Sequence, residues 1–157
     1  MTDAPFVPAE FEPPSGLEHP RFVLEPLGPQ HNERDYAAWT SSFDHVHATP
    51  GFTDSRWPRE MTLDENRVDL ERHQRDFQGR TGFTYTVLEA GDRDVIGCLY
   101  IYPLRDGPGA DVRSWVRADR AELDLPLAAA VAAWLEADWP FERVRYAGRP
   151  DLSRSAR

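Results

Sequence analysis

The stretch SWVRADRAELDLPLAAAVAAWL, residues 114–135, predicts a strand, a turn and a helix in that order. Residues 114–117 have an extended pattern, and residues 128–135 have a helical one. The turn between them lies where many nucleotide-binding proteins have a glycine-rich loop. Here it contains no glycine and carries three acids, Asp119, Glu122 and Asp124. The stretch therefore raises the question of whether this turn can bind a phosphate.

The chain on either side of this stretch predicts a single α+β domain. Strands are expected at 21–27, 83–89, 95–104, 110–117 and 143–148, and helices at about 29–43, 62–77 and 124–139. Thr62 and Glu65 form a capping-box pattern at the start of the second helix. The buried stripe of this helix is expected to consist of Leu63, Leu70, His73 or Gln74, and Phe77. No periodicity covers residues 44–61, which predicts a long irregular loop. The order β-α-α-β-β-β-α-β predicts a mixed, mainly antiparallel sheet flanked by helices.

The two ends of the chain differ from this domain in composition. Residues 1–20 contain five prolines among acids and small residues, which predicts an extended N-terminal arm that behaves as a loose tail. The domain is expected to span residues 21–148, and residues 149–157 form a C-terminal tail.

Composition excludes several classes of protein. The 157 residues fit one domain, and the net charge of −9 argues against a nucleic-acid surface. Cys98 is the single cysteine, so an intramolecular disulfide is impossible. No apolar run approaches the ~20 residues of a membrane span, so no membrane partner is expected. The acidic, proline-broken N-terminus is not a secretory signal, and we expect a cytoplasmic location.

Four segments carry a resemblance to a known family. They are VIGCLYIYPL (95–104), SWVRAD (114–119), AAWLEADW (132–139) and RVRYAG (143–148). In pattern and order they resemble the GNAT superfamily of acetyl-CoA-dependent N-acetyltransferases, over roughly residues 21–148. The resemblance implies a GNAT-like fold and acetyl-CoA as the acyl donor. It also implies transfer of an acetyl group to a primary amine of a small molecule or peptide.

The turn after the fourth predicted strand departs from the family pattern. GNAT proteins usually have R/Q-x-x-G-x-G/A there, whereas residues 121–126 read AELDLP. Asp124 is expected to cap the helix, in the place that a phosphate would take. A helix N-terminus offers an anion about 0.3–1 kcal/mol. One carboxylate ~5 Å from a phosphate charge costs roughly 3 kcal/mol at an effective dielectric constant of ~20. Weak or no binding of acetyl-CoA is therefore expected.

The resemblance nevertheless implies which residues would bind the donor, acetyl-CoA. Pantetheine could pair with the backbone of the fourth predicted strand, and two arginines could reach the phosphates. The implied donor-binding residues are Trp115, Val116, Arg117, Arg120, Ala121 and Leu125. The family usually continues with another helix and two more strands, but only nine residues follow Gly148. The sheet edge there would be exposed, which predicts a homodimer.

Three residues are candidates for proton transfer. Asp111 lies several residues before Val116, as the strand-borne glutamate of the family often does, and is a candidate general base. The alternative is a solvated acid at the start of a strand. His47 from the 44–61 loop is a second candidate base, and Tyr146 is a candidate proton donor. Tyr100 and Tyr102 alternate with apolar residues, which sheet packing explains, and the alternative is a phenol that faces the cleft and donates a proton.

The long loop and its neighbours supply candidate substrate contacts, namely Trp39, His45, Trp57 and Arg113. The sequence DHVH, residues 44–47, also resembles a metal-ligand pair. In an extended segment His45 and His47 would point the same way. No third ligand is evident, so no metal site is assigned. Cys98 alternates with apolar residues and is expected to be buried.

Two main functional hypotheses remain, ahead of a third in which His45 and His47 serve a metal-dependent enzyme. The first is an N-acyltransferase that moves an acetyl group from acetyl-CoA to a primary amine. The second is a non-catalytic GNAT-like protein that uses the cleft or the sheet edge to bind a ligand or partner. The acidic turn favours the second, and the pattern of strands and helices favours the first.

Overall fold

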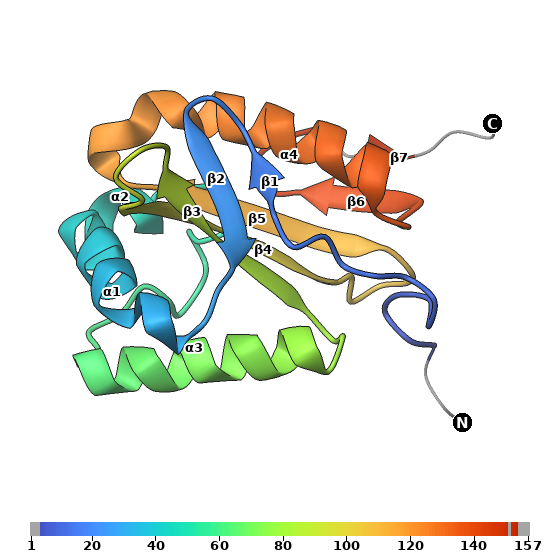
Figure 1. Ribbon diagram of the computed structural model, residues 1–157, viewed down its shortest axis with the longest axis horizontal. Coiled ribbons are helices and arrows are strands. Elements are labelled where there is room, and N and C mark those ends of the chain that lie inside the picture. Colours follow the sequence, from blue (N-terminus) through green and yellow to red (C-terminus); the bar gives the residue numbers. More distant parts are fainter. Residues whose placement is uncertain (1–3, 151, 154–157) are drawn as a thin grey trace.

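The computed structural model describes residues 4–150 and 152–153 of the chain, and a single twisted sheet runs through this part (Figure 1). Its seven strands lie side by side in sequence order: β1 (Leu17–Glu18), β2 (Phe22–Pro26), β3 (Phe83–Glu89), β4 (Val95–Pro103), β5 (Ala110–Val116), β6 (Arg143–Tyr146) and β7 (Leu152–Ser153). Only β5 and β6 are parallel, and the other neighbouring pairs are antiparallel. The predicted α+β class and mainly antiparallel sheet are confirmed.

Helices cover both faces of the sheet. The α-helices are α1 (Asn32–Ser41), α2 (Phe43–His47), α3 (Leu63–Gln78) and α4 (Asp124–Asp138), with 3-10 segments η1 (Pro29–His31) and η2 (Ala118–Leu123). Figure 1 shows α4 above the sheet and α1 and α3 on its other side. The helix α4 is the crossover that a parallel pair of strands requires. In the described part of the chain, no helix is long and apolar enough to cross a membrane.

Alternation along β4 and β5 divides the core into two layers. Leu99 and Val112 face α4, and Cys98 and Trp115 face α1 and α3. Cys98 is fully buried, as predicted, and burial raises the pKa of its thiol. The capping box of α3 is also confirmed: Thr62 Oγ1 accepts from Glu65 N at 3.1 Å, and Thr62 N donates to Glu65 Oε1 at 2.9 Å. Such a cap is worth about 1 kcal/mol.

The N-terminal arm is part of the core, so the expectation of a loose tail was wrong. Val7 is 2% exposed, and the Phe6 ring stacks on Phe141 with 5.0 Å between ring centres. The Tyr85 hydroxyl donates to the carbonyl of Pro14 at 2.7 Å. The arm therefore closes the α4 face of the sheet, and β1 adds a further strand.

Three other features differ from the sequence-based expectations. Part of the supposed irregular loop is the short helix α2. The edge of β6 is not open along its whole length, because β7 pairs with Arg143 and Val144. Leu63 was expected in the buried stripe of α3, but it is 40% exposed. Asn66 takes its place, one turn further along the helix.

Candidate active site

The strands β5 and β6 separate where their ladder ends. Their last paired residues are Val112 and Tyr146, and Ala147 N donates to Val112 O at 2.9 Å. Because Val112 faces β6 with its carbonyl, the N–H and C=O groups of Ser114 and Val116 face the same edge. No residue of β6 pairs with them. Within the described part of the chain, the end of β5 therefore offers an unpaired backbone edge that an extended ligand could join.

One side-chain pair spans this opening. The hydroxyl groups of Ser114 on β5 and Tyr146 on β6 lie 2.6 Å apart, and both residues are buried. Burial raises the pKa of Tyr146 to about 12, against the smaller opposite effect of the hydrogen bond with Ser114. Tyr146 therefore keeps its proton at neutral pH and can act as a hydrogen-bond or proton donor.

A groove of about 400 Å³ lies on the α4 side of the opening. It is lined almost entirely by apolar atoms of Leu125, Ala128, Ala129, Ala132, Tyr146, Arg149 and Pro150. Leu125 is 70% exposed at its rim. The groove joins the first turns of α4 to the end of β6, so a ligand lying in it would reach the Ser114–Tyr146 pair.

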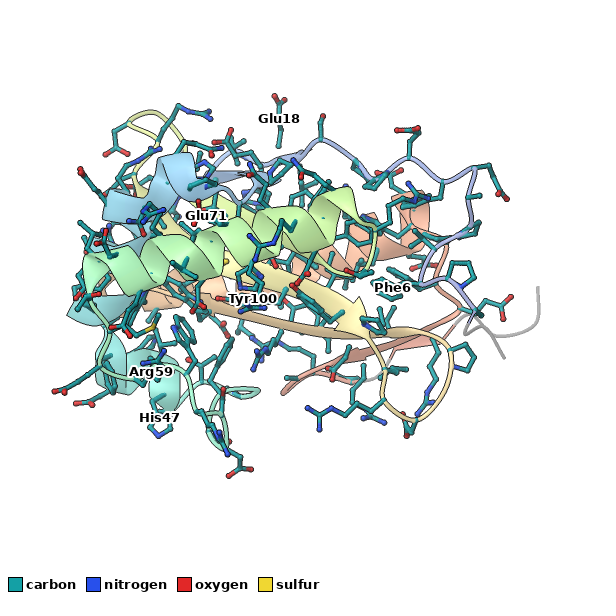
Figure 2. The ribbon with its side chains drawn as sticks, turned by 90° about the horizontal axis from the view of Figure 1, so that it is seen from below. Phe6, Glu18, His47, Arg59, Glu71 and Tyr100 are labelled. Atoms are coloured by element: carbon teal, nitrogen blue, oxygen red, sulfur yellow. The ribbon has the colours of Figure 1, made fainter. Side chains whose placement is uncertain are left out.

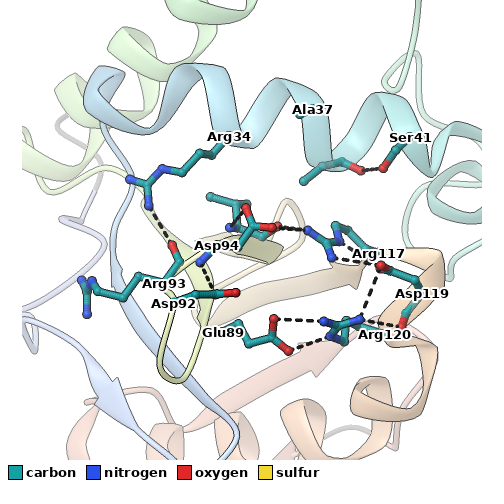
Figure 3. A network of polar contacts seen from close by, with 12 residues as sticks. Arg34, Ala37, Ser41, Glu89, Asp92, Arg93, Asp94, Arg117, Asp119 and Arg120 are labelled. Carbon is teal, nitrogen blue, oxygen red and sulfur yellow. Dashed lines mark hydrogen bonds and ion pairs between the residues drawn. The ribbon is translucent and has the colours of Figure 1, made fainter.

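The turn that leads into α4 is held by a network of ion pairs (Figure 3). Arg117 binds Asp94 of the β3–β4 hairpin at 2.8 Å and Asp119 at 2.9 Å. Arg120 binds Glu89 at 2.7 Å. Both arginines were expected to reach phosphates, and both are engaged by carboxylates of this chain.

The start of α4 also differs from the predicted cap. The 3-10 segment η2 runs directly into α4, so Asp124 is the first residue of the α-helix and not its N-cap. Its carboxylate instead pairs with Arg149. Of the other acids in this turn, Glu122 pairs with Arg21 at 3.6 Å and Asp119 with Arg117. The negative charge that was expected to repel a phosphate is therefore largely compensated by arginines.

A small pocket of about 220 Å³ lies on the opposite face of the sheet, between α1, α3 and β4. Its lining residues are Leu27, Asp35, Trp57, Asn66, Asp69, Leu70, Arg72, His73, Tyr100, Tyr102 and Arg113. Asp35 is 4% exposed and accepts a hydrogen bond from Asn66 Nδ2 at 3.1 Å. Burial raises the pKa of Asp35 to about 6. We call this cavity the Asp35 pocket.

His73 occupies a second polar position in the Asp35 pocket. Its Nδ1 lies 3.0 Å from the Tyr102 hydroxyl, which donates to Asp76 at 2.8 Å. The Thr84 hydroxyl lies 2.9 Å from the same Nδ1, so two hydroxyl groups hold the His73 ring in place. Burial and the nearby Arg72 lower the pKa of His73 to about 4, so the ring is neutral at pH 7.

The Asp35 pocket adjoins a larger groove of about 610 Å³, with which it shares Tyr100, Tyr102 and Arg113. This outer groove reaches Asp111 on β5, Gly51, and Ala147 after β6. The loop after α2 forms one wall of this groove. Gly51 of that loop lines the groove, and Gly51 O accepts from Arg113 Nη1 at 2.9 Å. The cleft on this face therefore runs from the Asp35 pocket to the end of β6.

The structure brings together only some of the residues expected in the site. Trp57 and Arg113 line the Asp35 pocket, and Asp111 lines the outer groove. Tyr146 lies at the opening between β5 and β6, but in the groove on the other face. Trp39 is 1% exposed and belongs to the core.

The two loop histidines are not placed as expected. His45 and His47 lie on α2, where side chains two residues apart point in different directions. Neither lines the cavities described above, and His47 Nδ1 lies 3.1 Å from Phe52 O. Figure 2 shows His47 at a corner of the molecule, apart from Tyr100. Within residues 4–150 and 152–153, no cluster of three or more possible ligands could hold a metal.

Two residues of the Asp35 pocket were missed from the sequence. Asp35 and Trp39 are four residues apart, and so are Asn66 and Leu70, so each polar side chain shares a helical face with a buried apolar one. A polar residue within a buried stripe is the signal that could have identified both.

Several solved acetyltransferase structures share this fold. A protein from Vibrio cholerae described as a ribosomal-protein-serine acetyltransferase has a TM-score of 0.67 and 12% identity, over 86% of this chain and 74% of its own. A Bordetella pertussis protein assigned to the GNAT family has a TM-score of 0.59 and 17% identity, over 83% of this chain and 77% of its own. The microcin C7 self-immunity acetyltransferase MccE, solved with acetyl-CoA and AMP, has a TM-score of 0.65 and 11% identity, over 85% of this chain and 73% of its own.

No family model matches the sequence, and no curated protein matches it. The structural likenesses confirm the GNAT fold that the sequence resemblance implied. In this fold the strand pair β5–β6, with α4 between its members in sequence, is the part that the segments SWVRAD, AAWLEADW and RVRYAG predicted.

Proposed function

We propose that this protein is an N-acyltransferase that moves an acetyl group from acetyl-CoA to an amine. The observation that carries the proposal is the opening between β5 and β6, which has an apolar groove on the α4 face and a polar cleft on the other face. This arrangement lets a donor and an acceptor approach one point from opposite sides. The GNAT fold supports the same reaction class.

The backbone of β5 fits the donor better than the turn does. The unpaired groups of Ser114 and Val116 can pair with the two amides of pantetheine, as a further strand would. The phosphates would lie near η2, where Arg117 and Arg120 first have to leave their carboxylate partners. We therefore expect weak donor binding that depends mainly on the pantetheine arm.

When bound, acetyl-CoA would supply an activated acyl carbon: the C–N bond to the amine forms and the C–S bond breaks. In this proposal Asp111, which lines the outer groove, takes the proton that the amine loses, directly or through water. In this proposal Tyr146 gives a proton to the departing thiolate, and its position at the opening and its protonation at neutral pH support the role. The acceptor is a small-molecule amine or the amine of a peptide.

A second candidate function is non-catalytic binding. The observation that favours it is the set of ion pairs that Arg117 and Arg120 make within the chain. A turn that is complete without a phosphate is compatible with a cleft that binds a ligand but no nucleotide.

A thiol-release assay distinguishes the two functions. Protein, acetyl-CoA and a panel of small amines and short peptides are incubated, and free coenzyme A and acetylated product are measured. The proposal predicts matched amounts of both products, with loss of activity when Tyr146 is replaced by Phe. Absence of product together with no thermal stabilisation by millimolar acetyl-CoA would overturn it, because a ligand at 100 times its Kd adds about 2.7 kcal/mol.

A further inference from the structure

The Asp35 pocket contains a buried carboxylate that lacks a positive partner. Asp35 accepts one hydrogen bond, from the neutral amide of Asn66. None of the ion pairs among the described residues includes it. Keeping a carboxylate buried without a cation is unfavourable, and proteins usually pair or replace such groups. The position is therefore better suited to receiving a cation than to stabilising the fold.

The amide that faces Asp35 is fixed by its other contacts. Asn66 Oδ1 accepts from the indole of Trp39 at 3.1 Å, and Asn66 Nδ2 also donates to Asn32 at 2.8 Å. These bonds determine which end of the amide points at the carboxylate. Asp35 is thus held in place, while one neutral donor leaves most of its acceptor capacity for a ligand.

The two arginines of the pocket are held by other groups. Arg72 lies 3.8 Å from Asp69 and 3.8 Å from Asp76. Arg113 donates to Gly51 O, and its guanidinium carbon lies 4.6 Å from the centre of the Phe52 ring. Arg113 also lies over the Tyr100 ring, 5.3 Å from its centre, so both cations have partners within this chain.

Aromatic rings supply the rest of a cation site. The ring centres of Trp57 and Tyr100 lie 6.5 Å apart, and those of His73 and Tyr100 lie 5.6 Å apart. The Tyr100 ring already has the Arg113 guanidinium carbon 5.3 Å from its centre. The face of tryptophan attracts organic cations, and the neutral His73 does not oppose them. The pocket thus combines a carboxylate with aromatic walls.

The size of the Asp35 pocket indicates that it holds one end of a ligand. Its volume of about 220 Å³ is below the roughly 300–1,000 Å³ of sites that enclose a whole small molecule. The outer groove continues from it to Asp111 and Ala147, at the opening between β5 and β6. Asp35 itself lies on α1 over β4, so a group bound there is at least one strand away from β5.

We propose that the Asp35 pocket binds a cationic group of the acceptor, at the end remote from the amine that is acylated. The acceptor is then a compound with two amino groups, or with one amino group and another small organic cation. That the other end of the acceptor carries the amine to be acylated rests on the proposed acyltransferase function. The cation site itself can be tested without any acyl donor.

The first experiment measures binding of n-butylammonium and of n-butanol by calorimetry and by two-dimensional NMR, near pH 8. We expect n-butylammonium to perturb residues of the Asp35 pocket and n-butanol to bind far more weakly. Asp35→Asn should weaken n-butylammonium binding roughly 10- to 100-fold, because a charged hydrogen bond is lost. Glu33→Gln, an exposed acid on the same helix, is the matched control and should leave binding unchanged.

The same titration near pH 5 adds a second criterion. Asp35 must be ionised to bind the cation. The titratable or charged groups around it are Asp69, Arg72 and His73 on α3, Cys98, Tyr100 and Tyr102 on β4, and Arg113 on β5. Cys98 and Tyr100 stay neutral at both pH values, because burial raises their pKa values. Affinity should therefore fall at the lower pH in the wild type but not in Asp35→Asn. Equal binding of both probes, or unaltered binding in Asp35→Asn, would overturn the proposal.

The second experiment compares linear terminal diamines of increasing length with monoamines in the acetyl-transfer assay. One diamine length should give a KM at least tenfold below that of the matched monoamine, and Asp35→Asn should abolish the difference while kcat changes little. No advantage for any diamine would overturn the assignment of the remote end. If neither amine class is acetylated although n-butylammonium binds at Asp35, the acyltransferase function fails and the cation site stands.

Discussion

Both oxygens of the Glu89 carboxylate bind Arg120: Nε donates to Oε1 at 2.7 Å, and Nη2 donates to Oε2 at 3.0 Å. The hydrogen bonds from Arg120 lower the pKa of Glu89, so the pair stays charged at neutral pH. This two-point pairing joins the end of β3 to the turn before α4. It also engages one of the two arginines nearest to the place expected for a diphosphate.

Replacing the partner of Arg120 should strengthen donor binding. In Glu89→Gln the guanidinium no longer faces a full negative charge, so it can turn to a phosphate at lower cost. We expect the affinity for acetyl-CoA, measured by titration calorimetry at low salt, to rise roughly 3- to 10-fold. High salt should reduce the gain, because screening weakens the new contact.

Glu12→Gln removes the same charge from the exposed arm and serves as the control for net charge. It should change the affinity by less than twofold. Equal affinities in Glu89→Gln and Glu12→Gln would show that the ion pairs of the turn do not limit donor binding.

Asp35 should reduce the stability of the free protein. The pKa of Asp35 is about 6 in the folded chain and near its ordinary value of 3.8 when unfolded. Between these pH values the folded state holds a proton that the unfolded state releases, so stability falls as pH rises through this window. Above pH 6 the ionised, buried Asp35 lowers the free energy of unfolding by its full amount, at most roughly 3 kcal/mol.

Asp35→Asn cannot ionise and still accepts the hydrogen bond of Asn66. We therefore expect it to raise the free energy of unfolding by roughly 1–3 kcal/mol near pH 8 and by much less near pH 4. Urea unfolding at both pH values measures the effect. A loss of stability near pH 8 would mean that Asp35 has a structural role, against the binding role inferred above.

Of the two hydroxyl groups that meet between β5 and β6, we expect that of Tyr146 to be catalytic and that of Ser114 to position it. Tyr146→Phe removes the proposed proton donor, and kcat should fall roughly 100-fold or more. Ser114→Ala removes only its hydrogen-bond partner and should lower kcat less than tenfold. Similar stability losses with unequal effects on kcat are the expected pattern, and equal kcat values in the two variants would contradict the role given to Tyr146.

The packing of the loop after α2 should require a glycine at position 148. A Cβ at Gly148 would lie 2.5 Å from Pro50 Cβ, and its φ of +75° is unfavourable for other residues. Gly91 has a φ of +103° but no atom within 4 Å of a Cβ, so it isolates the backbone effect. Gly91→Ala should cost about 1 kcal/mol. Gly148→Ala should cost clearly more in urea unfolding, and equal costs would show that the loop is not packed there.

The sequence predicted best those elements whose signals are local. The strands 83–89, 95–104 and 110–117 were found within one residue of β3, β4 and β5, because turn residues separate clear apolar runs. The capping box of α3 was found for the same reason. Each of these signals lies within a few residues of the element that it defines.

The features that were missed depend on contacts between distant segments. Val7 becomes a core residue, and Phe6 packs against the core on Phe83 of β3 and on Phe141 after α4, so both depend on segments far away in sequence. Arg117 and Arg120 were considered as phosphate ligands, but they have carboxylate partners on β3 and the hairpin after it. Asp35 gains its raised pKa from burial under α3, which no local pattern predicts.

The central claim is that a donor joins the unpaired edge of β5. NMR titration of the labelled protein with acetyl-CoA tests it most directly. The account predicts the largest amide shift changes at Ser114 and Val116, with smaller ones along Ala118–Leu123, and a loss of solvent exchange at the two strand amides. Saturating acetyl-CoA that leaves Ser114 and Val116 unchanged, or that shifts residues only elsewhere, would contradict it.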